Sequence, residues 1–221
     1  MSRLFLITFL DPSFGGILSR INLGSATMRV DDIKRILKRK KVGIAGCGGL
    51  GSNAAISLAR VGLGSLVLAD FDKVEESNLN RQYYFSGQVG SYKAIALKEN
   101  VRRVNPSVDV VAHLVELTPK LITDLFSGCD IVLEAFDRAE MKEMIIECVQ
   151  TAFPSMPLIS GMGMAGWGKN DLIGSMRSGN LYIVGDQQSE ASDENPPLAP
   201  RVGIVANMMA NLALELMLGS D

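Results

Sequence analysis

The chain has 221 residues, 47% of them hydrophobic, and its 22 basic side chains nearly balance its 24 acidic ones, for a net charge of −2. This length and composition suit a single domain with a real hydrophobic core, and the small net charge gives no reason to expect a nucleic-acid or membrane partner. Three scattered cysteines, Cys47, Cys129 and Cys148, argue against a disulfide framework and suit a reducing cytosol.

A first segment of about thirty residues stands apart from the rest. Its apolar run is ended by Asp11 and is too short for a membrane span or a strong secretory signal. We expect residues 1–30 to be a leader or N-terminal extension, and an edge strand or a functional start at Met28 stays open. Residues 31–221 are predicted to form one domain.

Helical and strand-like patterns then alternate as far as residue 161. Helices are predicted where apolar residues recur at helical spacing, over 31–40, 50–62, 92–106, 118–128 and 138–152. Short apolar strands are predicted over 41–46, 65–70, 108–117, 130–136 and 157–161. This alternation predicts a Rossmann-like α/β fold, a mostly parallel sheet with helices on both faces.

The last third of the chain changes character. Residues 161–186 are rich in glycine and contain one predicted strand, and residues 187–200 form a polar, proline-bearing loop. A long apolar helix over 201–218 closes the chain, as a core or an interface helix. We expect no run in the chain to reach the length of a membrane span.

A glycine-rich stretch separates the first predicted strand from the helix that follows it. Gly46, Gly48 and Gly51 match the pattern G-x-G-x-x-G, and Asp70 ends the next strand. Here the glycines allow a tight turn and close approach of a phosphate, the helix N-terminus offers free N–H groups, and the acid accepts hydrogen bonds from a ribose. The stretch predicts a nucleotide site; the alternative is a glycine-rich turn without a ligand.

The polar residues that follow favour ATP over a nicotinamide cofactor. Residues 70–94 bring aspartates, an asparagine, an arginine and a lysine to the mouth of the same crevice. Donors and cations of this kind suit a triphosphate. Hydride transfer instead uses a flat apolar slot with an acid or base beside the substrate.

Seven short motifs follow one another between residues 40 and 218. They are GCGGLGS (46–52), DFDKVEESNLNRQ (70–82), GSYKA (90–94), VNP (104–106), EAFD (134–137), PLISG (157–161) and APRVGIVANMMANLALE (199–215). Together they resemble the ThiF/MoeB/HesA family, bacterial relatives of ubiquitin-activating enzymes, and most of all a short ThiF-type sulfur carrier protein adenylyltransferase. The resemblance implies one ATP-binding adenylation domain over 31–221, with a crossover loop at about 163–200.

The resemblance also implies a reaction. The C-terminal Gly-Gly carboxylate of a ubiquitin-like sulfur carrier attacks the α-phosphorus of ATP and releases pyrophosphate, in thiamine (thiazole) biosynthesis. Because a carboxylate is already ionised, no general base is needed, and the only histidine, His113, is read as structural. The reaction needs instead cancellation of phosphate charge and alignment of the attack.

The resemblance assigns catalytic roles to Arg81, Lys93 and Asp137. Arg81 would fork onto phosphate oxygens, Lys93 would be a second cation, and Asp137 would hold Mg²⁺, with Asp72 as a second candidate ligand. The predicted nucleotide-binding residues are Gly46, Gly48, Gly49, Leu50, Gly51, Asp70, Asp72, Asn78, Arg81, Gln82 and Lys93. The structural alternatives are that Arg81 pairs with Glu75 or Glu76, that Lys93 is a solvated helix residue, and that Asp137 caps the helix over 138–152.

The sequence departs from the family pattern in its cysteines and its N-terminal arginines. It has no CxxC pair, so we predict no zinc, and no cysteine in residues 163–200, so we expect adenylation without a covalent thiol step. Cys47, in the glycine loop, is the alternative nucleophile. Family members supply an N-terminal arginine across a homodimer; the candidates are Arg20, Arg29 and Arg35, with Arg29 preferred.

Other functions stay open. A family member could activate another carboxylate, for a molybdopterin carrier or as a tRNA-modifying dehydratase. An NAD-dependent oxidoreductase and an inactive scaffold subunit are more distant alternatives. We expect a cytoplasmic homodimer whose partner is the carrier protein, with no nucleic acid and no membrane.

Overall fold

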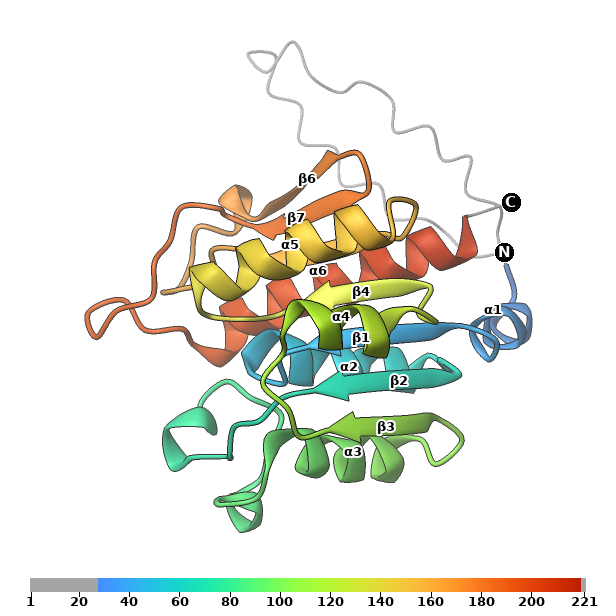
Figure 1. Cartoon of the computed structure of the whole chain (residues 1–221). Helices are drawn as coiled ribbons and strands as arrows, with labels where there is room; N and C mark the ends of the chain where they lie inside the picture. The colour runs from blue at the N-terminus through green and yellow to red at the C-terminus, as the bar shows by residue number, and fades with distance from the viewer. Residues whose placement is uncertain (1–27, 220–221) are drawn as a thin grey trace, which may run out of the picture.

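A seven-stranded sheet runs through the computed structural model, which describes residues 28–219 (Figure 1). Its strands are β1 (Lys41–Ala45), β2 (Ser65–Ala69), β3 (Asp109–His113), β4 (Ile131–Glu134), β5 (Leu158–Gly161), β6 (Gly174–Ser178) and β7 (Leu181–Gly185). They lie in the order β3-β2-β1-β4-β5-β7-β6, and only β6, at one edge, runs antiparallel to its neighbour.

Helices cover both faces of this sheet. They are α1 (Val30–Leu37), α2 (Gly49–Arg60), α3 (Lys93–Val104), α4 (Pro119–Phe126), α5 (Ala139–Ala152) and α6 (Ala199–Leu218), with short 3₁₀ turns η1 (Glu76–Asn78), η2 (Ser86–Gln88) and η3 (Asn170–Leu172). In Figure 1, α4 and α5 lie in front of the sheet, and α2, α3 and α6 lie behind it. The predicted Rossmann-like α/β fold is confirmed.

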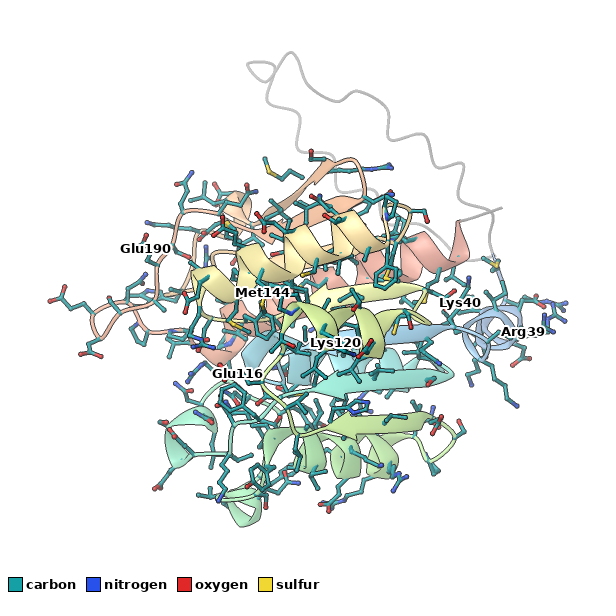
Figure 2. The ribbon with its side chains drawn as sticks, viewed as in Figure 1. Arg39, Lys40, Glu116, Lys120, Met144 and Glu190 are labelled. Carbon is teal, nitrogen blue, oxygen red and sulfur yellow. The ribbon has the colours of Figure 1, made fainter. Side chains whose placement is uncertain are left out.

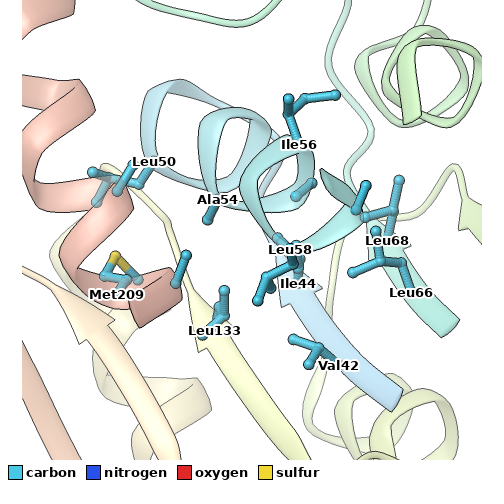
Figure 3. Packing of buried hydrophobic residues seen from close by; sticks show 14 of the residues in the cluster. Val42, Ile44, Leu50, Ala54, Ile56, Leu58, Leu66, Leu68, Leu133 and Met209 are labelled. Carbon is cyan, nitrogen blue, oxygen red and sulfur yellow. The ribbon is translucent and has the colours of Figure 1, made fainter. Parts of the chain in front are cut away.

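Successive side chains of the central strands build a separate hydrophobic core on each face. Ile44 and Leu68 pack on the side of α2, α3 and α6, whereas Ala45 and Val67 pack with α4 and α5. Figure 3 shows the first of these cores, where Met209 of α6 lies among side chains of α2 and the sheet. Strands buried on both faces explain why their sequences read as continuous apolar runs.

The structure departs from the predicted elements in the last third of the chain. Where one strand was expected, β6 and β7 form an antiparallel hairpin that turns at Gly179, whose φ is +59°. Four of the five residues of β6 are exposed and most are polar or glycine, so no apolar alternation marks it as a strand. The predicted crossover loop therefore contains part of the sheet.

Several element ends differ from the prediction by a few residues, and two of these differences affect the crevice. β3 ends at His113, four residues before the predicted end, and the chain then leaves the sheet. α6 begins at Ala199 and has Pro200 in its first turn. A proline is tolerated there because the backbone N–H that it lacks would have no partner within the helix. The crevice described below uses residues from both of these regions.

α6 is longer and more apolar than the sequence analysis allowed for. By length and composition alone, Ala199–Leu218 would suffice to cross a membrane. Core helices pass the same test, and one side of α6, which includes Val205, Met209 and Ala213, is buried against the rest of the chain. Ile204 on the same helix is exposed, so packing within the chain accounts for the apolar character of only part of α6.

The order of the strands creates a crevice at one end of the sheet. The chain proceeds from β1 to β2 and β3 on one side, and then returns to place β4 on the other side of β1. The loops that follow β1 and β4 therefore diverge to opposite faces at the carboxyl ends of these strands. In open α/β sheets, ligands bind at such a switch point.

Candidate active site

A cavity of about 870 Å³ opens at the carboxyl ends of β1, β2 and β4. Predicted site residues that line it are Gly46, Gly48, Gly49, Leu50, Asp70, Asp72, Arg81, Gln82, Lys93 and Asp137. Residues far apart in the sequence thus meet at one place. Two predicted nucleotide-binding residues, Gly51 and Asn78, do not line the cavity.

The glycine loop between β1 and α2 is compatible only with glycine at two of its positions. Gly46 has φ of +92°, a conformation that other residues rarely adopt. A side chain at Gly51 would collide with the carbonyl oxygen of Gly46. Gly51 therefore brings α2 close to the loop rather than contacting a ligand, and the loop presents the N-terminus of α2, with no side-chain cap, to the cavity.

Asp70 ends the second strand and is tied to two backbone N–H groups. Its Oδ2 accepts a hydrogen bond from the N–H of Cys47 at 2.6 Å, and its Oδ1 accepts one from the N–H of Asp72 at 2.8 Å. Burial raises the pKa of Asp70, although the two N–H groups and the charge of Lys93 act in the opposite direction. The carboxylate thus joins the glycine loop to the loop that follows β2.

Lys93 and Asp72 form an ion pair at the cavity. Lys93 begins α3; its Nζ lies 2.8 Å from Oδ2 of Asp72, and its backbone N–H donates to the carbonyl oxygen of Asp72 at 2.8 Å. The hydroxyl of Tyr84 lies 2.7 Å from the carbonyl oxygen of Cys47 and 3.2 Å from that of Lys93. Lys93 is buried, so the alternative of a solvated helix lysine is wrong.

Arg81 and Gln82 follow the turn η1 and are held in place by α2. Asn53 donates from Nδ2 to the carbonyl oxygen of Arg81 at 2.9 Å. Nη1 of Arg81 donates to the carbonyl oxygen of Ser77 and to Oδ1 of Asn80. Among the ion pairs of residues 28–219, none joins Arg81 to a glutamate, so the predicted surface alternative is not observed.

Gln82 has a buried amide oxygen that no other described residue satisfies. Its Oε1 has no hydrogen-bond partner in this part of the chain, and the side chain lines the cavity beside Gly48. Buried polar groups in native proteins are nearly always paired, so this oxygen is available to accept a hydrogen bond from a bound molecule or from water in the cavity. Asn78, in contrast, is used internally, since its Oδ1 accepts the N–H of Glu75.

Asp137 lies in the loop after β4 and faces the cavity opposite the glycine loop. The N-cap of α5 is Arg138, and no side chain caps that helix, so the predicted capping role of Asp137 is not observed. The described residues contain no group of three or more potential metal ligands. Mg²⁺ usually takes only one or two carboxylates and completes its shell with phosphates and water, so Asp137 and Asp72 fit a substrate-bound Mg²⁺.

Two further walls complete the cavity, and sequence reasoning missed the first of them. One is apolar and includes Val115, Leu117 and Phe136, from the loops after β3 and β4. The other belongs to residues 186–197, which we call the strap, and includes Asp193. The strap belongs to the crossover segment that the resemblance to the family predicted, and that segment was expected to lie over the site.

The sequence alternatives for Cys47 and His113 are settled by their surroundings. Cys47 is fully buried, and burial, with the charge of Asp70, raises the pKa of its thiol well above the usual value. A reactive thiol needs the opposite, a lowered pKa and access to solvent. His113 ends β3 and is not among the residues that line the cavity, and its backbone carbonyl oxygen accepts the N–H of Asp70 in the sheet.

Two of the three candidate N-terminal arginines, Arg29 and Arg35, lie away from the cavity of their own chain. α1 lies at the amino ends of the strands (Figure 1), and Figure 2 shows Arg39 and Lys40, which follow it, at the opposite end of the sheet from Glu190 of the strap. Arg29 and Arg35 both pair with Asp32 at the surface. The third candidate, Arg20, lies outside the described residues.

Comparison with known proteins shows which sequences the chain is similar to. It is 28% identical over 190 residues to the "Adenylyltransferase and sulfurtransferase UBA4" of Saccharomyces cerevisiae, which covers 83% of this chain and 43% of that protein. It is 36% identical over 129 residues to the protein of the same name in Emericella nidulans, covering 58% of this chain and 26% of that protein. The chain thus spans less than half the length of these relatives.

Solved structures share its fold. The E. coli tRNA N6-threonylcarbamoyladenosine dehydratase TcdA in complex with ATP superposes with a TM-score of 0.78 at 22% identity, over 86% of this chain and 90% of that one. E. coli MccB with ATP gives 0.62 at 23% identity, over 84% and 57%. A family model described as the ThiF family matches residues 20–221. This match spans nearly all of the sequence, and the chain therefore belongs to the ThiF family.

Proposed function

We propose that this chain is an ATP-dependent adenylyltransferase that activates the terminal Gly-Gly carboxylate of a ubiquitin-like sulfur carrier protein. The observation that carries the proposal is the convergence of Arg81, Lys93 and Asp137 with the glycine loop around one cavity. The UBA4 relatives are adenylyltransferases and sulfurtransferases by name, and TcdA and MccB form complexes with ATP; both facts support the same chemistry.

The reaction suits the groups that the cavity contains. A carboxylate that attacks the α-phosphorus displaces pyrophosphate and forms a mixed acyl-phosphate anhydride, without a proton to remove. The required work is to neutralise the phosphates and to align the attack. Lys93 and the half-buried Arg81 supply positive charge, and the N-terminus of α2 supplies free N–H groups beside them.

Two regions of the cavity suit the base and the ribose of a nucleotide. The apolar wall around Val115 and Phe136 offers a surface for a purine, and Asp70, at the end of β2, is placed to accept hydrogen bonds from a ribose. The unpaired amide oxygen of Gln82 supplies a further hydrogen-bond acceptor in the same cavity. Asp137, with Asp72 as the second candidate, would hold Mg²⁺, which supplies charge stabilisation at the phosphates.

We infer that adenylation proceeds without a covalent thiol intermediate on this chain. Residues 163–200 contain no cysteine, and the thiol of Cys47 is buried with a raised pKa. Sulfur would then be delivered by another protein, and thiazole synthesis is the pathway that we propose. The N-terminal arginine and the homodimer through which it would reach a partner's site belong to the same proposal.

A second candidate is a dehydratase that activates a carboxylate on modified tRNA. The observation that favours it is length, since TcdA and this chain match over 90% and 86% of their residues. The near-neutral charge of the chain argues against it, because tRNA binding requires a basic surface.

One experiment separates the two candidates. ATP–pyrophosphate exchange is measured with a panel of carriers that end in Gly-Gly, with the same carriers lacking these two residues, and with tRNA bearing the threonylcarbamoyl group. Exchange that needs an intact carrier tail supports the sulfur-carrier proposal. Exchange with the tRNA and with none of the carriers would replace it by the dehydratase.

A further inference from the structure

A buried ion pair joins the start of α6 to the end of β7. Nη2 of Arg201 lies 2.5 Å from Oδ2 of Asp186, and the two side chains are 4% and 5% exposed. Nη1 of Arg201 also donates to the carbonyl oxygen of Gly168. One guanidinium therefore connects a helix, the end of a strand and the glycine-rich segment before β6.

The remaining oxygen of Asp186 organises the first residues of the strap. Its Oδ1 accepts the N–H of Gln188 at 2.9 Å and that of Ser189 at 2.8 Å. Burial alone would raise the pKa of Asp186, but these N–H groups and Arg201 hold it well below its usual range. Asp186 is therefore a carboxylate at neutral pH, and both of its oxygens are used.

The strap is tied down at both ends and exposed in its middle. Near its start, Oγ of Ser189 accepts the N–H of Ala165 at 3.1 Å, and near its end the carbonyl oxygen of Pro196 accepts the N–H of Gly166 at 3.0 Å. The middle, which includes Asp193, is exposed to solvent and lines the cavity. The tethered ends thus decide where this wall of the cavity lies.

Stability alone is a weak explanation for this ion pair. Burying two charges costs desolvation that their attraction often only offsets, and apolar replacements of such pairs are frequently neutral or stabilising. Nε of Arg201 is moreover buried without a hydrogen-bond partner among residues 28–219. What the pair adds is geometry, since it links the start of the strap directly to α6, whose Val202 also lines the cavity.

We propose that the Asp186–Arg201 ion pair is a clamp that holds the strap in place as a wall of the nucleotide cavity, which makes Arg201 a positioning residue. The role toward nucleotide rests on the proposed function; the role in holding the strap does not. Arg201 acts through the strap and does not line the large cavity itself.

The test replaces both charges together, because removing one alone would leave the other buried and unpaired. The variant D186N/R201M keeps an acceptor for the N–H groups of Gln188 and Ser189. The matched control is D124N/K120M, which removes an exposed ion pair on α4 by the same kind of substitution. Each protein is digested with a protease specific for glutamate, which can cut the strap after Glu190 and Glu194.

Cleavage after Glu134, which is fully buried in the central strand β4, is the internal reference for global unfolding. We expect D186N/R201M to fold and to lose strap protection, with cleavage at the strap relative to Glu134 rising about fivefold or more. The control should match the wild type. An unchanged ratio in a folded D186N/R201M protein would overturn the proposal. Failure of this variant to fold would also overturn it, because the ion pair would then be needed for the stability of the whole fold.

The second measurement is the KM for ATP in pyrophosphate exchange. We expect it to rise about threefold or more in D186N/R201M, with a smaller fall in kcat, and to recover partly in R201K, which restores the charge without the second contact to Gly168. If the wild type shows no exchange, the proposed function fails while the proteolysis result still decides the clamp. Loss of strap protection with an unchanged KM would overturn the role of the clamp toward nucleotide.

Discussion

The ammonium nitrogen of Lys93 lies 2.8 Å from a carboxylate oxygen of Asp72, across the mouth of the cavity. The lysine side chain is 10% exposed, and that of the aspartate is 51% exposed. The positive charge is therefore held inside the cavity, and its partner is the more solvated of the two. A phosphate that enters would compete with Asp72 for Lys93, which gives Asp72 a role that does not require a metal.

Replacing Lys93 should remove phosphate binding and leave the fold intact. Lys93→Met keeps the apolar stem and removes the charge, and Asp72 stays solvated. We expect pyrophosphate exchange to fall about a hundredfold, the loss typical of a removed charge-stabilising group. The matched control is Lys120→Met, at an exposed lysine that pairs with Asp124. Equal activity of both variants would exclude Lys93 from the site.

Replacing Asp137 by asparagine should impair the reaction more than replacing Asp72 by asparagine. We expect Asp137→Asn to lower exchange about a hundredfold and to raise the Mg²⁺ concentration needed for half-maximal activity, whereas Asp72→Asn lowers exchange by about tenfold or less. The reason is that Asp72 is already engaged by Lys93. Magnesium titrations of the two variants check this. The reverse order would make Asp72 the principal ligand.

Alanine substitutions at two glycines of the loop should have different effects, one on stability and the other on ATP binding. A Cβ at Gly51 would collide with the carbonyl oxygen of Gly46, so Gly51→Ala should lower the free energy of unfolding by about 1–3 kcal/mol or more. A Cβ at Gly48 would meet nothing nearer than Nε2 of Gln82 at 3.8 Å. Gly48→Ala should therefore fold normally and bind ATP more weakly, because the added methyl group occupies cavity space. Urea titration and calorimetric ATP binding measure the two effects.

Cys47 should be dispensable for the chemistry. Its thiol is buried, and Cys47→Ala removes one sulfur from a packed site, at a cost of about 1 kcal/mol in stability. We expect exchange in this variant to stay within about threefold of the wild type, and native Cys47 to resist alkylation by iodoacetamide. Loss of exchange in a folded Cys47→Ala protein would restore the thiol as a nucleophile.

The raised pKa of Asp70 makes the free energy of unfolding depend on pH. Burial disfavours the carboxylate, so between the ordinary pKa of an aspartate and the raised value the folded chain binds more protons than the unfolded chain. The free energy of unfolding contributed by Asp70 therefore falls as pH rises through this window. Urea titrations of wild type and Asp70→Asn should show the wild type losing stability relative to the variant. A difference that is flat or rises with pH would contradict this.

The sequence predicted the part of the site that depends on local pattern. Gly46, Gly48 and Asp70 were recognisable because a strand, a glycine turn and a helix follow one another, and this order places them at one end of the sheet. The motif that contains Arg81 and Gln82 was equally local. These residues line the cavity as the pattern indicates.

The rest of the site depends on contacts between distant segments. Nothing in the local sequence shows that Asp72 pairs with Lys93, or that Asn78 turns inward to cap η1. Arg201 lies in an apolar helical pattern, and only the fold brings it to Asp186. β6 was missed for the same reason, since its place at the sheet edge comes from pairing with β7 and not from its own polar residues.

The products of the reaction test the central claim most directly. The chain is incubated with a Gly-Gly carrier and with ATP labelled either at the α- or at the γ-phosphorus. Attack on the α-phosphorus predicts that the α-label stays with the acyl-adenylate of the carrier and that the γ-label appears in pyrophosphate, with neither product formed by a carrier without its terminal glycines. Formation of ADP with orthophosphate or a phosphorylated carrier would contradict the account.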